Sequence, residues 1–207
     1  MSETFLNLDF AKQKRIVDAA LMEFAKHGYE KASTNRIVKE AGIGKGMLFY
    51  YFKSKKELYH YLFDYCMKFI ISEYLSKIDE NERDFIERYK QAGQAKLKAN
   101  VKNPGVFTFL GSFVVNQNID LPEKIEKQYK ELRTLGYSKI YNNIDTSLFR
   151  EDVEGEKIFK FIRWSMEGYE KELLQRLQGV NLSTFDATPY WDEFYEYLDD
   201  LKKIFYK

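Results

Sequence analysis

The segment from Thr34 to Lys55, TNRIVKEAGIGKGMLFYYFKSK, constrains the fold of this chain more than any other part of it. Thr34 is a good N-cap residue, and the apolar residues that follow it at helical spacing predict a helix of about two turns. Gly42 then stands where the end of a helix favours a positive φ. Met47 and the aromatic run after it indicate a second, very short helix. Two helices joined by a turn of about three or four residues form a helix-turn-helix, whose second helix can lie in the major groove of DNA.

The rest of the chain also shows helical periodicity. Residues 12–27 carry an apolar face that ends before Gly28, and Ser54 with Glu57 forms a capping box at the start of a long helix. Phe107 and Phe109 alternate as in a strand, but the apolar residues of 106–115 also fit helical spacing, and we predict a helix there. With only three prolines in 207 residues, these patterns predict an all-α fold. Further helices are expected at about residues 85–101, 122–144, 158–177 and 188–205.

Electric charge is unevenly distributed along the chain. The formal net charge is only +1, but residues 1–56 hold 11 Lys and Arg against 6 Asp and Glu, whereas residues 57–207 hold 22 against 26. The N-terminal quarter is therefore basic and the remainder acidic. Because the DNA backbone attracts basic surfaces, this division favours a DNA-reading head on a body that does not bind DNA.

Three further features bound the class of protein. Cys66 is the single cysteine, so no intramolecular disulfide is possible, and a cytoplasmic location is expected. The thiol of Cys66 is interpreted as a packed side chain rather than a redox sensor. The N-terminus shows neither the basic nor the apolar region of a signal peptide. No run of about 18 apolar residues is present, so we expect no membrane partner.

The order of residues around the helix-turn-helix closely resembles the N-terminal domain of TetR-family (TetR/AcrR-like) transcriptional regulators. The resemblance covers about residues 10–65, and its matching positions are Thr34, Ile37, Ala41, Gly42, Ile43, Lys45, Gly46, Leu48, Phe49, Tyr50, Phe52 and Lys55. It implies a DNA-binding domain at residues 1–54, with the helix-turn-helix at about 33–52, and a helical ligand-binding and dimerisation domain at residues 55–207. Such a regulator binds double-stranded operator DNA as a homodimer and responds to a small-molecule effector, whose identity is unknown here.

The resemblance also implies roles for individual side chains. The residues expected at or near the base edges are Lys45, Gly46, Met47, Phe49 and Tyr50. This fits the physical expectation that the N-terminal residues of a recognition helix point into the groove. The residues expected to contact phosphate are Thr34, Tyr51 and Lys55, and Arg36 is expected as an additional DNA contact. Leu48 and Phe52 are instead expected in the core.

Three positions depart from the family pattern. Gly44 stands where Ser or Thr is common, Phe49 replaces a more usual Tyr, and Tyr51 replaces a frequent His. The first two changes remove hydroxyl groups, and the third exchanges an imidazole for a phenol. The operator sequence therefore cannot be transferred from any relative.

The body is rich in aromatic residues, and the family resemblance implies a cavity for an apolar or aromatic effector. An aromatic residue at helical spacing is more often core than pocket, so the following are only candidates for its lining: Phe85, Tyr89, Phe107, Phe109, Phe113, Tyr129, Tyr137, Tyr141 and Trp164. In TetR-like regulators the last two helices form a four-helix bundle with the same pair of a second subunit. The dimer interface is accordingly expected at Ile162, Met166, Tyr169, Leu173, Trp191, Phe194, Leu198 and Leu201. The alternative is that these same residues pack inside one chain.

The sequence contains no recognisable catalytic constellation. His27 and His60 have no nucleophile or metal-spaced partner, and the glycines at 42–46 lack the spacing of a P-loop. We therefore predict a DNA-binding regulator that is not an enzyme and needs no metal or cofactor, and specifically a repressor that an effector releases from a palindromic operator. An activator, an effector-independent regulator, and a protein-interaction module with a purely structural helix-turn-helix remain alternatives.

Overall fold

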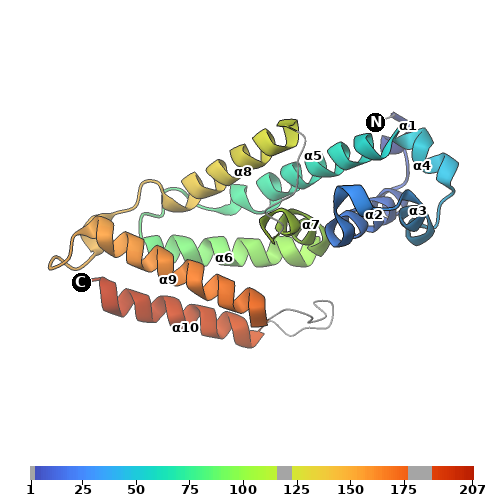
Figure 1. Cartoon of the computed structure of the whole chain (residues 1–207). Coiled ribbons are helices and arrows are strands. Elements are labelled where there is room, and N and C mark those ends of the chain that lie inside the picture. The colour runs from blue at the N-terminus through green and yellow to red at the C-terminus, as the bar shows by residue number, and fades with distance from the viewer. Residues whose placement is uncertain (1–2, 116–122, 177–187) are drawn as a thin grey trace. The chain divides into compact units, whose positions relative to one another are not determined.

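The computed structural model describes residues 3–115, 123–176 and 188–207, and these residues are almost entirely helical (Figure 1). The α-helices are α1 (Glu3–Leu6), α2 (Phe10–Lys31), α3 (Thr34–Ala41), α4 (Lys45–Tyr51), α5 (Lys55–Glu73), α6 (Phe85–Lys102), α7 (Pro104–Val115), α8 (Glu123–Tyr141), α9 (Gly155–Arg176) and α10 (Thr188–Phe205). Two short 3-10 helices are Leu75–Lys77 and Thr146–Leu148. In the described residues, β pairing is limited to one isolated bridge between Phe149 and Tyr206. The prediction of an all-α fold is confirmed.

The chain divides into two compact units. Unit 1 consists of Met1–Ile78 and Ala92–Lys139, and unit 2 of Asp79–Gln91 and Ile140–Lys207. Helix α6 contributes residues to both units. The two units are defined by how compactly their residues pack. The boundary predicted after residue 54 separates a DNA-binding domain from a ligand-binding domain, and it stays a prediction.

Unit 1 is built around α2. Its buried residues recur at helical spacing, and they include Ile16, Ala20 and Phe24. The helix packs against α3, α5 and α7. It runs beyond the predicted end at His27, because the chain bends at Gly28 (φ 67°, ψ 174°) and forms one more turn to Lys31. Tyr29 in that turn stacks on Phe24 with ring centroids 6.3 Å apart.

The helix-turn-helix consists of α3, a glycine turn and α4. Gly42 ends α3 in the left-handed region (φ 66°, ψ 40°), as predicted, and Ile43 N–H donates to the Val38 carbonyl at 3.0 Å. The predicted N-cap was wrong by one residue, because Ser33 occupies that position and Thr34 is the first residue of the helix. The side chain of Ser33 makes no capping hydrogen bond. The backbone N–H of Ser33 donates to the carboxylate of Glu23 at 2.7 Å.

The predicted helices after the motif are present with small shifts at their ends. Ser54 caps α5 by accepting from the N–H of Glu57 at 3.1 Å. The segment 106–115 is helical, as predicted, within α7. Helix α8 ends at Tyr141, three residues earlier than expected, and Pro122, predicted to open it, lies outside the described residues. None of the described helices is long and apolar enough to cross a membrane.

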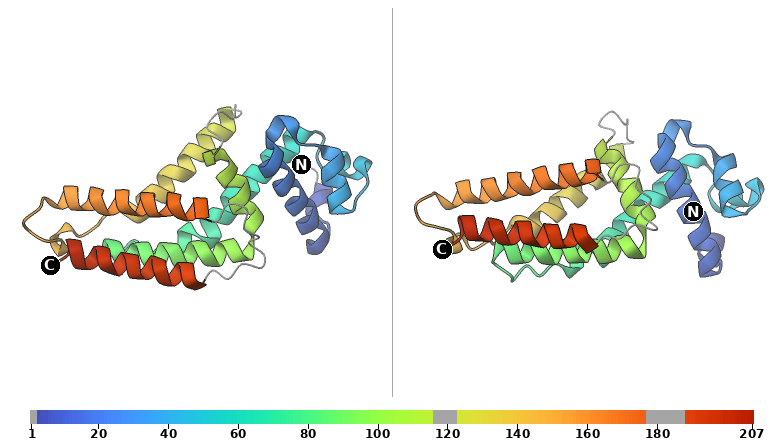
Figure 2. Two further views of the ribbon diagram at one scale, coloured as in Figure 1. Left: turned by 60° about the horizontal axis from the view of Figure 1, so that its bottom comes forward. Right: turned by 90° about the horizontal axis from the view of Figure 1, so that it is seen from below.

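Unit 2 has its core where α9 and α10 lie antiparallel beside the first half of α6 (Figures 1 and 2). Its fully buried members include Phe85, Ile158, Ile162, Met166 and Leu198. Burying one such side chain stabilises a fold by about 1.5–3 kcal/mol.

The unit 2 core contains most of the residues assigned to the dimer interface, and that interface stays a prediction. Five of the eight residues assigned to it are buried within one chain: Ile162, Met166, Phe194, Leu198 and Leu201. The physical reason is that the apolar stripes of α9 and α10 face each other and α6, so one chain already covers them. Tyr169, Leu173 and Trp191 are half-buried.

A buried arginine holds together two loops of unit 2. Arg88 on α6 has no exposed surface, and its guanidinium donates to the carbonyls of Glu82 at 2.6 Å, Glu80 at 3.0 Å, and Asn142. The loss of hydration on burial lowers the pKa of Arg88. Because each hydrogen bond ends on a main-chain oxygen, Arg88 ties the loop before α6 to the loop after α8.

The first prediction concerns Gly42. Replacing it by alanine should lower the free energy of unfolding by about 1–2 kcal/mol, because a Cβ is unfavourable in left-handed backbone. The new Cβ would meet no atom within 4 Å, so the loss of unfolding free energy would come from the backbone conformation and not from a steric clash. Urea denaturation measures it. Gly42→Asn is the control and should lose less, since asparagine tolerates this region. Equal stability of Gly42→Ala and the wild type would contradict the assignment.

Candidate nucleic-acid interface

Helix α4 divides its side chains between the core and the surface. Leu48 and Tyr51 are 1% and 4% exposed, whereas Met47 and Tyr50 are 38% and 64% exposed. Lys45 and Gly46 are also exposed, and Phe49 is half-buried. The first turn of the helix and the ring of Tyr50 are therefore available to a partner.

The packed side of α4 continues into Phe52, which follows the helix and is 1% exposed. Leu48 and Phe52 are thus core residues, as predicted. Tyr51, expected to reach phosphate, is packed, with its ring centroid 5.7 Å from that of Phe5. The burial of Tyr51 leaves Tyr50 as the exposed ring of the pair, so a phosphate contact from Tyr51 stays a prediction without structural support.

The start of α3 is fixed by one carboxylate on α2. Arg36 Nε lies 2.9 and 3.0 Å from the two carboxylate oxygens of Glu23, and the same carboxylate accepts from Ser33 N–H. Arg36 also donates to the Lys31 carbonyl at 3.0 Å. The carboxylate side chain is only 9% exposed, and that of Arg36 is 52% exposed. A phosphate contacting Arg36 would therefore have to compete with Glu23.

The charges of this network set its pKa values. Burial raises the pKa of Glu23, but hydrogen bonds from Arg36 and Ser33 outweigh that effect and leave the pKa below its ordinary value of 4.5. The hydrogen bond to Glu23 in turn raises the pKa of Arg36. Both groups are charged near neutral pH, so the network is an ion pair that fastens α3 to α2.

Lys55, at the start of α5, also has a structural role. Its amino group donates to the carbonyls of Glu30 at 3.1 Å and Ala32 at 3.2 Å, and it lies 4.8 Å from the centre of the Tyr29 ring. These contacts hold the last turn of α2 against α5. Exposed cations flank Lys55 at Lys53 and Lys56, two positions that the sequence analysis did not single out. Thr34 is half-buried at the first position of α3.

Phe5 is the residue next to α4 that sequence reasoning missed. It is fully buried against the rings of Tyr51, Phe52 and Tyr61. A single phenylalanine in a short N-terminal segment has no periodic pattern around it, so the sequence offers no signal for this contact.

The nine candidate residues for an effector cavity do not form one group. Phe85, Tyr89, Tyr141 and Trp164 belong to unit 2, and the others belong to unit 1. Trp164 and Tyr137 are 54% and 48% exposed. Within unit 1, Phe113 contacts Phe109 and Tyr129, with ring centroids 5.1 and 5.6 Å apart. The effector cavity itself stays a prediction.

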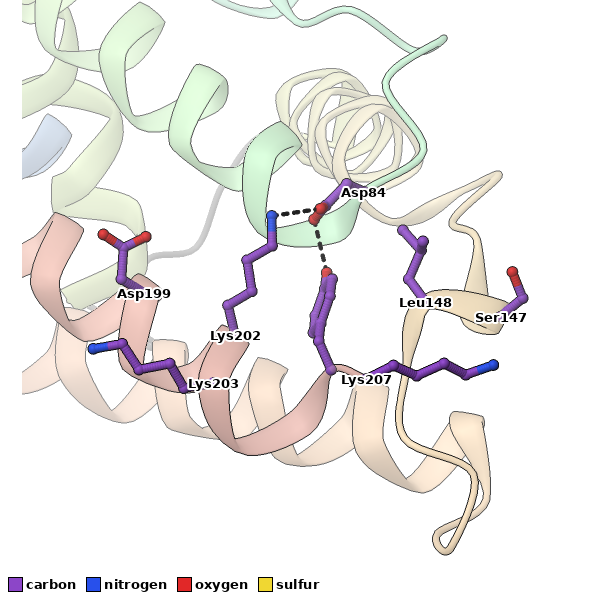
Figure 3. Close-up of a pocket in the computed structure, with 8 residues that line it drawn as sticks. Asp84, Ser147, Leu148, Asp199, Lys202, Lys203 and Lys207 are labelled. Atoms are coloured by element: carbon purple, nitrogen blue, oxygen red, sulfur yellow. Dashed lines mark hydrogen bonds and ion pairs between the residues drawn. The ribbon is translucent and has the colours of Figure 1, made fainter.

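A hollow of about 540 Å³ opens in unit 2 but has a different chemistry from the predicted cavity (Figure 3). Its floor is Asp84, which accepts from Lys202 at 2.7 Å and from the Tyr206 hydroxyl at 2.8 Å. Lys203 on its rim pairs with Asp200 at 2.8 Å. The charged side chains that line it distinguish this hollow from the apolar or aromatic cavity predicted from the sequence.

Comparisons with known proteins bear on both units. The family model described as bacterial regulatory proteins of the tetR family matches residues 16–62. The fatty acid metabolism regulator protein of Bacillus subtilis (strain 168) is 28% identical over 150 residues, which cover 65% of this chain and 69% of that protein. Sequence similarity therefore extends well beyond the helix-turn-helix.

Two solved structures share the fold over nearly the whole chain. One is a TetR family transcriptional regulator from Chloroflexus aurantiacus J-10-FL, with a TM-score of 0.66, 21% identity, and coverage of 100% of this chain and 98% of that one. The other is the ketosteroid transcriptional regulator KstR2 of Mycobacterium tuberculosis, with a TM-score of 0.62, 17% identity, and coverage of 97% of each chain. At these identities the likeness shows the fold alone.

The second prediction concerns the pH dependence of the Glu23 network. A carboxylate with a lowered pKa stabilises the folded state above its unfolded pKa, and this contribution is lost as the pH falls through the folded pKa. Wild-type protein should therefore lose more unfolding free energy than Glu23→Gln between about pH 6 and pH 3. Urea denaturation at several pH values measures the difference. Glu40→Gln, at an exposed position of α3, is the control. Parallel pH profiles for wild type and Glu23→Gln would refute this role.

Proposed function

Because this chain belongs to the TetR family of bacterial transcriptional regulators, we propose that it is a repressor that binds a palindromic operator as a homodimer. A small apolar or aromatic effector releases it from the DNA. The observation that carries this proposal is the division of α4, which exposes Lys45, Gly46, Met47 and Tyr50 and buries Leu48. A helix with an exposed first turn and a packed opposite side is suited to insertion into the major groove.

The exposed residues of α4 suit different parts of the DNA. The amino group of Lys45 can donate to guanine O6 and N7 or to a phosphate, and Met47 can contact a thymine methyl group. Gly46 has nothing within 4 Å of the position of an added Cβ, so the helix is free to approach the DNA closely there. The base contacts we propose are therefore those of the first turn of α4, with Tyr50 beside them.

A second copy of the chain is the occupant that we propose for the outer face of α9 and α10. Phe161, Trp164 and Ile204 on that face are 43%, 54% and 53% exposed. Phe161 bridges the two helices, with its ring 6.1 Å from Trp164 and 6.2 Å from Phe205. Exposed apolar surface of this kind is typical of an association site. Two copies related by a two-fold axis would cover it with the same patch.

Gly168 supports this choice of face. It lies seven residues after Phe161 and four after Trp164, so the three residues share one side of α9. A Cβ added at Gly168 would meet nothing within 4 Å inside the chain. The glycine therefore leaves room for the close approach of another helix.

The proposed effector class rests on similarity and on the aromatic packing of unit 1. The similar proteins include a fatty acid metabolism regulator protein and, by fold, a ketosteroid transcriptional regulator, and both names point to largely apolar molecules. Within unit 1, ring contacts link Tyr129 on α8 through Phe113 and Phe109 to Tyr59 on α5. Tyr59 in turn contacts Phe24 of α2. An apolar molecule that separates these rings would favour a different packing of α2, and it shifts binding only by its differential affinity for the two states.

The third prediction tests DNA recognition. Duplexes are selected from a random pool, and the selected sequence is titrated with wild-type and variant protein at several salt concentrations. Lys45→Ala should weaken binding by about 1–3 kcal/mol if it contacts guanine, or reduce the salt slope by about 1 if it contacts phosphate. Lys98→Ala on α6, also an exposed lysine, is the matched control. Unchanged binding by Lys45→Ala would exclude the proposed orientation of α4, and failure to enrich any duplex would exclude the proposed function.

The fourth prediction tests the dimer. Trp164→Glu should convert the dimer to monomers at micromolar concentration, because a carboxylate buried between two apolar faces is strongly unfavourable. Sedimentation velocity measures the oligomeric state. Val101→Glu places the same charge at an apolar residue of α6 that is 72% exposed, and this control should stay dimeric. A Trp164→Glu variant that remains a dimer would place the interface elsewhere.

A further inference from the structure

The segment before α2 has one buried side chain among exposed neighbours. Phe5 is 0% exposed, while Leu6 is 53% exposed and Thr4 is exposed as well. The ring of Phe5 lies 4.7 Å from that of Phe52 and 5.7 Å from that of Tyr51. It therefore contacts the last residue of α4 and the residue that follows it.

The same ring also reaches α5. Phe5 lies 5.3 Å from Tyr61, and Tyr61 lies 5.2 Å from Phe52. Three rings thus surround Phe5, two from the end of α4 and one from α5. Aromatic rings at these separations attract one another beyond the area that they bury.

Hydrogen bonds hold this segment to the start of α2. The side-chain amide of Gln13 donates to the carbonyls of Leu6 at 3.0 Å and Leu8 at 2.8 Å. Leu8 N–H donates to the Phe5 carbonyl at 3.2 Å, and Asp9 caps α2 by accepting from Lys12 N–H at 2.8 Å. We call residues 3–9 the N-terminal clamp, because α2 holds one end of it and the aromatic cluster holds the other.

Helix α4 needs such support. It has only seven residues, its N-cap Gly44 makes no side-chain bond, and its second residue is Gly46. A helix this short is not stable without tertiary packing, and a glycine within it lowers its stability further. Leu48 packs near its middle, and Phe5 covers its C-terminal end.

From these contacts we propose that Phe5 is a positioning residue for DNA recognition: through Tyr51 and Phe52 it fixes the end of α4, and so the direction in which Lys45, Met47 and Tyr50 point. This inference rests on the proposed function of α4 as the recognition helix. Phe5 itself does not contact DNA in this account. Its effect on binding is transmitted through the packing of α4.

The fifth prediction tests the clamp with Phe5→Ala. Operator binding should weaken by about tenfold, as expected when the support of a binding site is loosened. The amides of Leu48 and Phe52, which hydrogen-bond within α4, should exchange with solvent about tenfold faster, whereas amides of α9 should not. Leu6→Ala is the matched control, because Leu6 lies in the same helix with its side chain exposed, and it should behave like the wild type.

Two further variants keep the test decisive. Gln13→Ala releases the other end of the clamp and should produce a weaker form of the Phe5→Ala result. If Phe5→Ala does not fold, Phe5→Leu takes its place, with the same expectation for exchange in α4.

Two outcomes would overturn the proposal. One is operator binding by the folded variant that equals the wild type. The other is exchange that accelerates evenly over α2, α4 and α5, since Phe5 would then be an ordinary core residue. The exchange measurement needs no DNA. If wild-type protein enriches no duplex, the proposed function fails, while localised exchange in α4 still decides whether the clamp exists.

Discussion

The shortness of the recognition helix is the constraint on which the rest of unit 1 depends. A helix of seven residues, with Gly44 as its N-cap and Gly46 as its second residue, cannot remain helical without neighbours. The turn at Gly42 sets where α4 begins, and the buried side chains of Leu48 and Phe52 set which side faces inward. The surface of α4 that we propose for DNA binding is therefore a result of packing on the opposite side of the same helix.

The cations near this surface have two kinds of role. Arg36 is held by Glu23, and Lys55 by two carbonyls at the end of α2. These two charges hold the helices around the motif together. Lys45 on α4 is exposed. A net charge counted from the sequence treats these three cations alike. In the structure, Arg36 and Lys55 are already engaged in contacts within the chain, whereas Lys45 is exposed.

The parts predicted correctly from sequence are those fixed by local signals. Gly42 marked the turn because a positive φ favours glycine, and Ser54 marked the start of α5 because its hydroxyl caps the next turn. Five of the residues predicted for the interface are buried inside one chain, because α9 has apolar residues on two sides. Periodicity places Ile162 and Phe161 on different faces, but it does not say which face the same chain covers. Phe5 was missed because its partners are distant in sequence.

The arginine at the centre of unit 2 has a consequence for how that region tolerates change. Arg88 is bound by the carbonyls of residues 80, 82 and 142, and a carbonyl is the same for every amino acid. A different side chain at one of those three positions would leave the main-chain acceptor of Arg88 in place, although a change at Glu82 would also remove the carboxylate that accepts from Asp84 N–H at 2.8 Å. The length of each loop is constrained, because one inserted or deleted residue would move an acceptor away from a guanidinium that water does not reach. The hydrogen bonds of Arg88 thus constrain the number of residues in these loops more than the identity of the residues that supply the acceptors.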